Sequence, residues 1–229
     1  MNIQDILLPT NEYVNEVAAK SIIFLHHTAG GHRPDWVVND WKNDRNAQGN
    51  RIRVATSFVI GGISTTTGDN TYDGQIVRCF PENKWAYHLG VGGDTLNKKS
   101  IGIEICNYGP LTFEAGRGYV NYVNKVVPNS LVIELAQPFR GFRFYHRYTD
   151  RQLDSVNELV HHLATSFGIN LNLGLKVQIN ANMANSAAAF ELNANALNGN
   201  AGVWTHTNVR SDKSDCSPQL PLIQLLRGL

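Results

Sequence analysis

The feature that most restricts the fold of this chain is an amphipathic segment that begins at Thr149 and stops at Gly168. Thr149 and Gln152 form a capping-box pattern, in which each side chain bonds a free backbone N–H at the start of a helix. Apolar side chains then follow at helical spacing on one face: Leu153, Val156, Leu159, Val160, Leu163 and Phe167. A helix of this kind buries its apolar face against another layer, so the chain must supply that layer elsewhere.

Short apolar segments predict the strands of such a layer. They lie at residues 22–25, 58–60, 75–80 and 101–106, and Gly, Asn, Asp or Pro bounds each of them. Further helices are expected at residues 34–41, where Pro34 suits a first helical position, and at the apolar residues from Leu222 to Leu226. Helices that cover a sheet make an α/β fold, so we expect a single domain over residues 1–229 with a central mixed β-sheet flanked by helices.

Two regions are expected to be insertions in this domain. Residues 111–147 mix aromatic residues with Gly and Pro, which predicts a long ordered insertion or additional short elements. Residues 180–200 are rich in Asn and Ala with little apolar periodicity, which predicts a surface excursion that is helical in part. The sequence shows no internal repeat and no break in composition, so we expect no second domain.

Charge and cysteine content argue against several classes of protein. Lys and Arg number 20 and Asp and Glu number 19, which leaves a net charge of +1 and no electrostatic case for nucleic acid as the main partner. Apolar residues make up 42% of the chain and charged residues 17%, which excludes global disorder. Cys79, Cys106 and Cys216 are odd in number and widely spaced, so a disulfide scaffold is not expected.

The amino-terminal residues do not resemble a secretion signal, because no basic start precedes an apolar run. No stretch approaches the roughly 18 consecutive apolar residues of a membrane-spanning helix. We therefore expect a soluble protein that is made in the cytoplasm and has no stable membrane association. A monomer is expected as well.

The apolar segment 22–25 runs directly into His26 and His27 and then into a turn of small residues at 28–31. Strand ends that open into Gly-rich loops are frequent positions of functional sites. A lone histidine at a strand end is more often structural than a ligand, and a second adjacent histidine changes that balance only slightly.

Far downstream, His206 and Cys216 stand ten residues apart across a polar loop. An imidazole and a thiolate are both zinc ligands, and His26 can supply a third. Three protein ligands leave a fourth tetrahedral position for water, which is typical of a catalytic zinc site. In the alternative interpretation Cys216 is a small buried hydrophobic residue and His206 is a surface loop residue, and spacing alone favours neither.

The apolar segment 101–106 contains one carboxylate, Glu104. Side chains alternate along a strand, so Gly102, Glu104 and Cys106 share a face. A carboxylate in such a strand needs a partner, and Gly102 beside it leaves open space where a ligand can approach. The alternative is that Glu104 pairs with an Arg or Lys at the sheet edge.

Residues 85–93 place His88 among aromatic residues and glycines. Such a loop can line a groove for a sugar or a peptide, because aromatic faces stack on ligands and glycines let them approach. His88 alone is weak evidence for this. His161 and His162 are expected at the surface of the long helix.

Together these segments resemble, in order along most of the chain, the zinc-dependent N-acetylmuramoyl-L-alanine amidases of the type 2 superfamily, whose fold is shared with peptidoglycan recognition proteins. The matching segments are residues 26–30, 57–60, 73–76, 81–90, Asn97, 100–104, 148–153, His206 and Cys216. Each piece is weak alone, whereas the ordered combination is specific.

The resemblance implies a role for each matching residue. His26, His206 and Cys216 would bind one Zn²⁺ ion in a surface groove, Cys216 taking a position where other members have Asp or Cys. Glu104 would be the general base that takes a proton from zinc-bound water and returns it to the departing amine. His27, Thr28 and His88 would line the groove and contact substrate, together with Asn97 and Arg210.

Two departures from the family pattern concern further catalytic groups. Members often carry a lysine two residues before the third ligand, where it stabilises the oxyanion, but Ser214 stands there and the lysine is Lys213. Lys213, His88, Arg210 or zinc itself would then take that role. The branch with a catalytic tyrosine on the second strand has its counterpart near Thr56, so this chain would rely on Glu104.

The activity implied is hydrolysis of the amide between N-acetylmuramic acid and L-alanine in peptidoglycan or its soluble muropeptides. We expect an endolysin of phage or prophage type that reaches the wall after release, or an enzyme acting on wall fragments in the cytoplasm. Two alternatives remain open: a peptidoglycan-binding module that has lost catalysis, and a metal-free hydrolase that uses Cys216 with His206 as base.

Overall fold

The strand predicted at residues 22–25 lies in the main sheet of the computed structural model, next to its edge strand, and the structure describes residues 1–229. β2 (Ile22–His27) pairs in parallel with β5 (Ser100–Ile105) on one side and with β11 (Gly202–Thr205) on the other. Beyond β5 lie β3 (Phe58–Ile60), β4 (Ile76–Arg78) and β1 (Ile3–Asp5), with β3 and β4 antiparallel. The sheet is therefore mixed, which confirms the predicted α/β fold.

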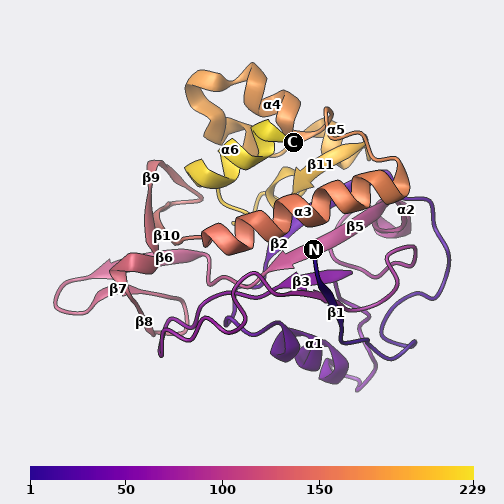
Figure 1. The fold of residues 1–229 in the computed structure, drawn as a ribbon, viewed down its shortest axis with the longest axis horizontal. Coiled ribbons are helices and arrows are strands. Elements are labelled where there is room, and N and C mark those ends of the chain that lie inside the picture. The colour runs from indigo at the N-terminus through magenta and orange to yellow at the C-terminus, as the bar shows by residue number, and fades with distance from the viewer.

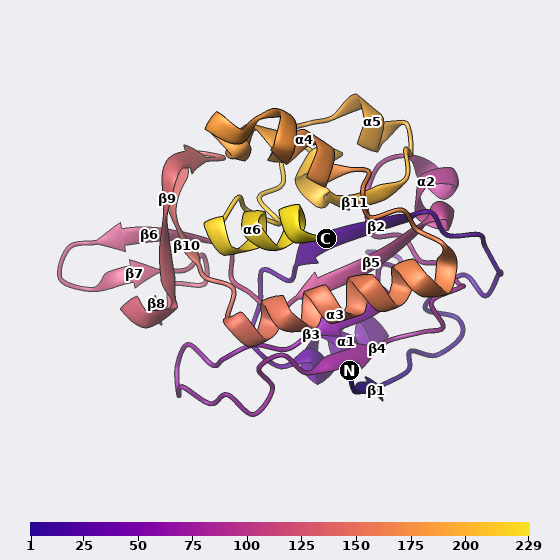
Figure 2. The ribbon, with the colours of Figure 1, turned by 45° about the horizontal axis from the view of Figure 1, so that its top comes forward.

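Helices cover both faces of this sheet (Figure 1). α3 (Asp150–Phe167) lies on one face and carries the predicted capping box between Thr149 and Gln152. α4 (Leu175–Ala181) and α6 (Leu220–Gly228) contact each other near β11, and α6 also contacts α3 (Figure 2). α1 (Pro34–Asn43) lies on the opposite face, against β3 and β4. None of the helices has the length and apolar character needed to cross a membrane.

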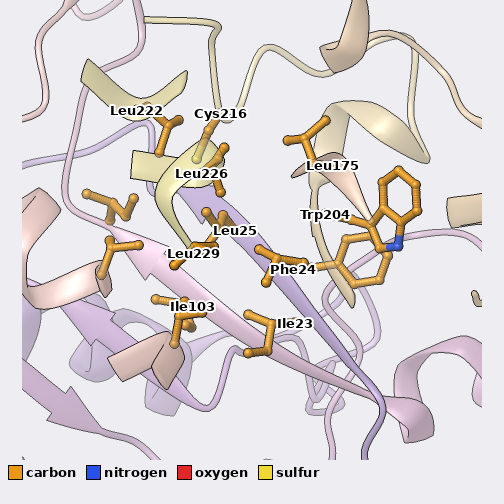
Figure 3. Packing of buried hydrophobic residues seen from close by; sticks show 14 of the residues in the cluster. Ile23, Phe24, Leu25, Ile103, Leu175, Trp204, Cys216, Leu222, Leu226 and Leu229 are labelled. Carbon is orange, nitrogen blue, oxygen red and sulfur yellow. The ribbon is translucent and has the colours of Figure 1, made fainter. Parts of the chain in front are cut away.

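The helices on both faces of the sheet explain which strand residues are buried. All six residues of β2 are buried, as expected for a parallel strand with helices on both sides of its sheet. In β3, Phe58 and Ile60 belong to the core cluster that includes the apolar face of α3, whereas Val59 packs with Val38 of α1. The main cluster also receives Trp204 and residues of α4 and α6, shown in Figure 3.

The region 111–147 forms a second, antiparallel sheet. Its strands are β6 (Pro110–Glu114), β7 (Gly118–Val120), β8 (Val126–Val127), β9 (Val132–Phe139) and β10 (Phe142–His146), in the order β8-β7-β6-β10-β9, with the short helix η1 (Asn129–Leu131) before β9. This sheet projects from one end of the domain (Figure 1). It follows directly after β5, and its first strand begins five residues beyond the end of that strand.

The remaining elements surround β11 and β5. Residues 180–200 contain the end of α4, then η2 (Met183–Phe190) and α5 (Ala194–Leu197), while α2 (Gly93–Lys99) leads into β5. Phe190 and Ala196 are fully buried in the main core, so this region is anchored to the domain as well as exposed in part.

Candidate metal and catalytic site

Adjacent parallel strands bring the predicted residues to one edge of the main sheet. β2 ends with His26 and His27, and Glu104 of β5 lies directly opposite His26 in the strand register. β11 leads into the short helix η3 (His206–Asn208), so His206 follows the strand on the other side of β2. The carboxyl ends of parallel strands share an edge, which is where sites form in sheets of this class.

His26, His206 and Asp215 form a compact group of potential metal ligands. Their ligand atoms all lie within 4.8 Å of one another, and all three residues are buried. Oδ2 of Asp215 is 3.0 Å from Nδ1 of His206 and 3.4 Å from Nδ1 of His26. Two imidazoles and a carboxylate form a ligand set that zinc accepts.

Hydrogen bonding shows that this group suits a cation. Nε2 of His206 is 3.0 Å from the carbonyl oxygen of Leu89, which can only accept, so Nε2 carries the proton. In neutral His206 the lone pair of Nδ1 then faces the carboxylate oxygen of Asp215. Two acceptors facing each other in a buried site repel unless a positive charge lies between them. A second bond that orients the ring in this way is also typical of metal-ligating histidines.

The structure corrects the predicted third ligand from Cys216 to Asp215. Cys216 is fully buried in the main core, among Leu222 and Leu226 (Figure 3). Burial raises the pKa of the Cys216 thiol well above its usual value, although a hydrogen bond with Tyr148 opposes the shift. The ligand group contains Asp215 and not Cys216, and a thiol that is fully buried in the core and kept neutral is not placed to act as a nucleophile, which argues against the metal-free cysteine hydrolase.

The position of Asp215 also removes one departure from the family pattern. Lys213, not Ser214, stands two residues before Asp215. The charge of Lys213 is close enough to the site to lower the pKa of both Glu104 and His27. The signal that the sequence offered was this lysine spacing, together with the Asp or Cys found at the third position in the family.

Glu104 shares the face of the sheet on which His26 lies. Its Oε2 atom is buried and has no hydrogen-bond partner, and Glu104 forms no salt bridge, so the predicted alternative of an ion pair at the sheet edge is wrong. Burial raises the pKa of Glu104 well above its usual value, and the charge of Asp215 adds to that effect. A carboxyl group with a raised pKa can both accept and return a proton near neutral pH.

The space beside Gly102 is not open to a ligand, contrary to the prediction. A Cβ atom at residue 102 would lie 2.7 Å from Cγ2 of Thr56 and 3.0 Å from Nδ1 of His88. Gly102 therefore makes room for these two side chains.

His27 and Thr28 line two different cavities beside the metal-ligand group. His27 points to the opposite face of the sheet from His26, with Nδ1 3.2 Å from the hydroxyl of Tyr148, and it lines a cavity beside the second sheet. Burial lowers the pKa of His27 to about 4, so the ring is neutral at pH 7. Oγ1 of Thr28 accepts a hydrogen bond from the backbone N–H of Asn107, and Thr28 borders a cavity beside α1.

His88 and Asn97 hold neighbouring parts of the site in place: His88 contacts His26, and Asn97 bonds the backbone of His88. Nδ1 of His88 is 2.9 Å from Nε2 of His26, and its Nε2 is 2.8 Å from the hydroxyl of Ser100. The buried Asn97 accepts hydrogen bonds from the backbone N–H groups of His88 and Leu89, and so holds the backbone at these two residues in place. The structure thus gives both side chains a supporting position, and the contact with substrate predicted for them stays a prediction.

Arg210 lies partly exposed beside Gly90, which follows Leu89 in the chain. Its guanidinium forms two hydrogen bonds with Asp212 and packs over Gly90, where a Cβ atom would clash with Nη1. Leu89 and Ser100, which orient the two histidines, were not predicted as functional residues, because a backbone carbonyl and a lone serine carry no distinctive sequence signal.

Comparison with known proteins gave a match to one protein family and similarity to several solved structures. A sequence model described as N-acetylmuramoyl-L-alanine amidase matches residues 17–217. Comparison with curated proteins gave no match. A mutant of PlyL has a similar structure, with a TM-score of 0.50 and 15% identity over 100% of this chain and 92% of that chain. At this identity the likeness shows a shared fold.

Two other solved structures are similar by this comparison. N-acetylmuramoyl-L-alanine amidase LysC from Clostridium intestinale has a TM-score of 0.49 and 15% identity, covering 98% of this chain and 95% of that chain. Hydrolase AmiA from Staphylococcus aureus, in complex with its ligand, has a TM-score of 0.49 and 14% identity, covering 99% of this chain and 82% of that chain.

Proposed function

Because the chain belongs to the type 2 N-acetylmuramoyl-L-alanine amidase family, we propose that it uses one zinc ion to hydrolyse the amide between N-acetylmuramic acid and L-alanine of the peptidoglycan stem peptide. The observation that carries this proposal is the convergence of His26, His206 and Asp215 beside Glu104, whose buried Oε2 atom has no partner.

His26, His206 and Asp215 would hold the zinc ion, the two histidines through the Nδ1 atoms that face Asp215. Zinc supplies Lewis acidity, which polarises an amide carbonyl and acidifies water. The protein fixes the direction of both imidazoles through their Nε2 atoms, by way of Leu89 and His88. These two bonds hold the imidazoles in an orientation that suits metal binding.

Glu104 is the proposed general base and acid. Its unpartnered Oε2 atom can take a proton from the attacking water and then donate it to the departing amine of L-alanine. The raised pKa of Glu104 favours the second of these transfers, because a carboxyl group of higher pKa keeps its proton until the amine leaves.

Lys213 is the proposed stabiliser of the oxyanion. It lies two residues from Asp215, and its backbone carbonyl accepts a hydrogen bond from the guanidinium of Arg140. This bond ties the loop that carries Lys213 to the end of the second sheet, so the ammonium group approaches the site from an anchored backbone.

We further propose that the protein is an endolysin that acts on the bacterial wall. The test of the chemistry is mass spectrometry of purified peptidoglycan after incubation with the protein, with and without a zinc chelator. Stem peptides that begin at L-alanine, and that disappear when chelator is present, are the expected products. Intact peptidoglycan that retains the protein would instead support a binding module, and cleavage at another bond would refute the proposed substrate.

A further inference from the structure

The cavity beside His27, here called the sheet cavity, has neither Glu104 nor any residue of the metal-ligand group in its lining. Its volume is about 560 Å³, within the range of roughly 300–1,000 Å³ typical of small-molecule sites. The second sheet forms one wall, where Thr112 and Glu114 of β6 face inward. His27 and Ser214 form the other wall. Because Ser214 adjoins Asp215, a molecule in this cavity lies next to the metal-ligand group.

One buried side chain in the sheet cavity offers an unused hydrogen-bond donor. Asn121 is only 4% exposed, and its Oδ1 atom accepts from the backbone N–H groups of Val123 and Lys125. Its Nδ2 atom is buried and has no partner. A buried donor without a partner is costly, and Asn121 lines the cavity, so an acceptor bound there would satisfy this amide.

Aromatic rings form another part of the lining. Tyr108, Tyr122 and Phe142 all border the sheet cavity. Tyr122 is 67% exposed, yet its hydroxyl donates a 2.5 Å hydrogen bond to the backbone oxygen of Ala29, which fixes the ring at the rim. Exposed rings held in one position offer flat apolar faces for stacking, and such faces suit the apolar side of a sugar ring.

Charge distinguishes the sheet cavity from its neighbour. No Lys or Arg lines the sheet cavity, and its single acidic residue, Glu114, is paired with Arg117 at 2.6 Å. The cavity on the other side of Tyr122 and Ala29, beside α1, contains Arg33, Asp40 and Asp44. The stem peptide carries free carboxylate and amino groups, whereas the sugars of the glycan strand are uncharged. The α1 side therefore suits the peptide, and the sheet cavity suits the glycan.

We propose that the sheet cavity binds an uncharged N-acetylated sugar of the glycan strand, next to the muramyl residue whose amide is cut. The acetamido oxygen of that sugar accepts a hydrogen bond from Nδ2 of Asn121, and its ring stacks on Tyr122. This proposal rests on the proposed function for the identity of the substrate. It adds that the second sheet is the part of the protein that recognises glycan.

Direct binding tests the proposal without catalysis. The probe is di-N-acetylchitobiose, titrated into the zinc-loaded protein. NMR follows the side-chain amide signal of Asn121 in the unmodified protein, and titration calorimetry measures the affinity of the unmodified protein and of each variant. Asn121→Asp keeps the Oδ1 acceptor of the bonds from Val123 and Lys125 but loses the Nδ2 donor. Its affinity for chitobiose should therefore fall about tenfold, the effect of one good hydrogen bond. Phe113→Ala is the matched control, because Phe113 is an exposed aromatic residue of β6 that does not line the cavity.

Kinetics with two substrates tests where the sugar binds. One substrate is a disaccharide peptide, N-acetylglucosaminyl-N-acetylmuramyl-peptide, and the other is the same muramyl peptide without the first sugar. Tyr122→Ala should raise KM for the disaccharide peptide about fivefold more than it raises KM for the muramyl peptide, the difference expected from one stacking contact, since Tyr122 also borders the cavity beside α1. Phe113→Ala should change neither value.

The outcomes separate this proposal from the proposed function. If neither substrate is cut but chitobiose still shifts the Asn121 signal, the glycan site stands and the amidase chemistry fails. If both substrates are cut and Tyr122→Ala affects them equally, or if chitobiose leaves the Asn121 signal unmoved, the glycan site is refuted and the amidase stands. A shift of the Asn121 signal by sugar-free stem peptide, but not by chitobiose, would also overturn the proposal.

Discussion

The proton shared between His26 and His88 belongs to His26. The hydroxyl of Ser100 donates to the backbone oxygen of Leu96 at 2.9 Å, so it must accept from Nε2–H of His88. Burial lowers the pKa of His88 well below its usual value, so this ring is neutral and its Nδ1 atom is an acceptor. Nε2 of His26 is therefore the donor at 2.9 Å, and the lone pair of Nδ1 is directed toward Asp215.

His88→Ala should weaken zinc binding without removing a ligand. The variant leaves Nε2–H of His26 without an acceptor, and loss of such a supporting bond typically lowers metal affinity about 10–100-fold. Competition with a chromophoric chelator measures the change, and His162→Ala, at an exposed position on α3, is the control. An unchanged zinc affinity in a folded His88→Ala protein would show that His26 does not depend on His88.

Asp215→Asn and Cys216→Ser distinguish the two candidate third ligands. Asp215→Asn removes the charge that faces both histidines, so zinc should be lost from the purified protein. Cys216→Ser buries a hydroxyl in the core, so it should retain one zinc ion and lose about 1–3 kcal/mol of stability. Metal analysis by mass spectrometry, together with urea denaturation, separates these results. Loss of zinc from Cys216→Ser alone would restore the cysteine as ligand.

Glu104→Gln should abolish turnover while leaving the metal in place. Gln keeps the shape of the side chain but cannot exchange a proton, and a general base typically contributes about 10²–10⁴-fold to the rate. The measurement pairs kcat on a muropeptide with zinc content. Glu134→Gln, at an exposed position on β9, is the control. A rate within a few-fold of that of the unmodified protein would refute the assignment of Glu104.

The parts of the fold that could be predicted are those that local patterns determine. The helix at α3 follows from its capping box and apolar face, and β2 and β5 follow from continuous apolar runs. The second sheet was not predicted as a sheet, because its strands are short and many of their side chains are exposed. Such strands are stabilised by pairing with one another, which local patterning does not show.

The residues of the site that follow directly from strand ends and residue types could be predicted from the sequence. His26, His206 and Glu104 lie together because three parallel strands end at one edge. The choice between Asp215 and Cys216 depends on which of two consecutive side chains turns toward the histidines. That direction is set by packing of Cys216 against α6, a long-range contact that residue spacing does not reveal.

His146 links the second sheet to the main sheet and should make stability depend on pH. Its Nδ1 atom accepts a hydrogen bond from the backbone N–H of Tyr108 at 3.1 Å, and burial lowers its pKa to about 3. Between pH 6.5 and 3 the unfolded chain binds a proton at this residue and the folded chain does not, so stability falls as pH falls.

His146→Asn tests this pH dependence. Oδ1 of asparagine can accept the Tyr108 hydrogen bond but does not titrate, so the variant should lose less stability on acidification than the unmodified protein. From the two pKa values, about 2 kcal/mol of the loss between pH 7 and pH 5 belongs to His146. Urea denaturation at both pH values measures the difference, and His161→Asn, on the exposed face of α3, should leave it unchanged. Equal losses in the unmodified protein and in His146→Asn would mean that His146 is charged in the folded state, which its bond to Tyr108 forbids.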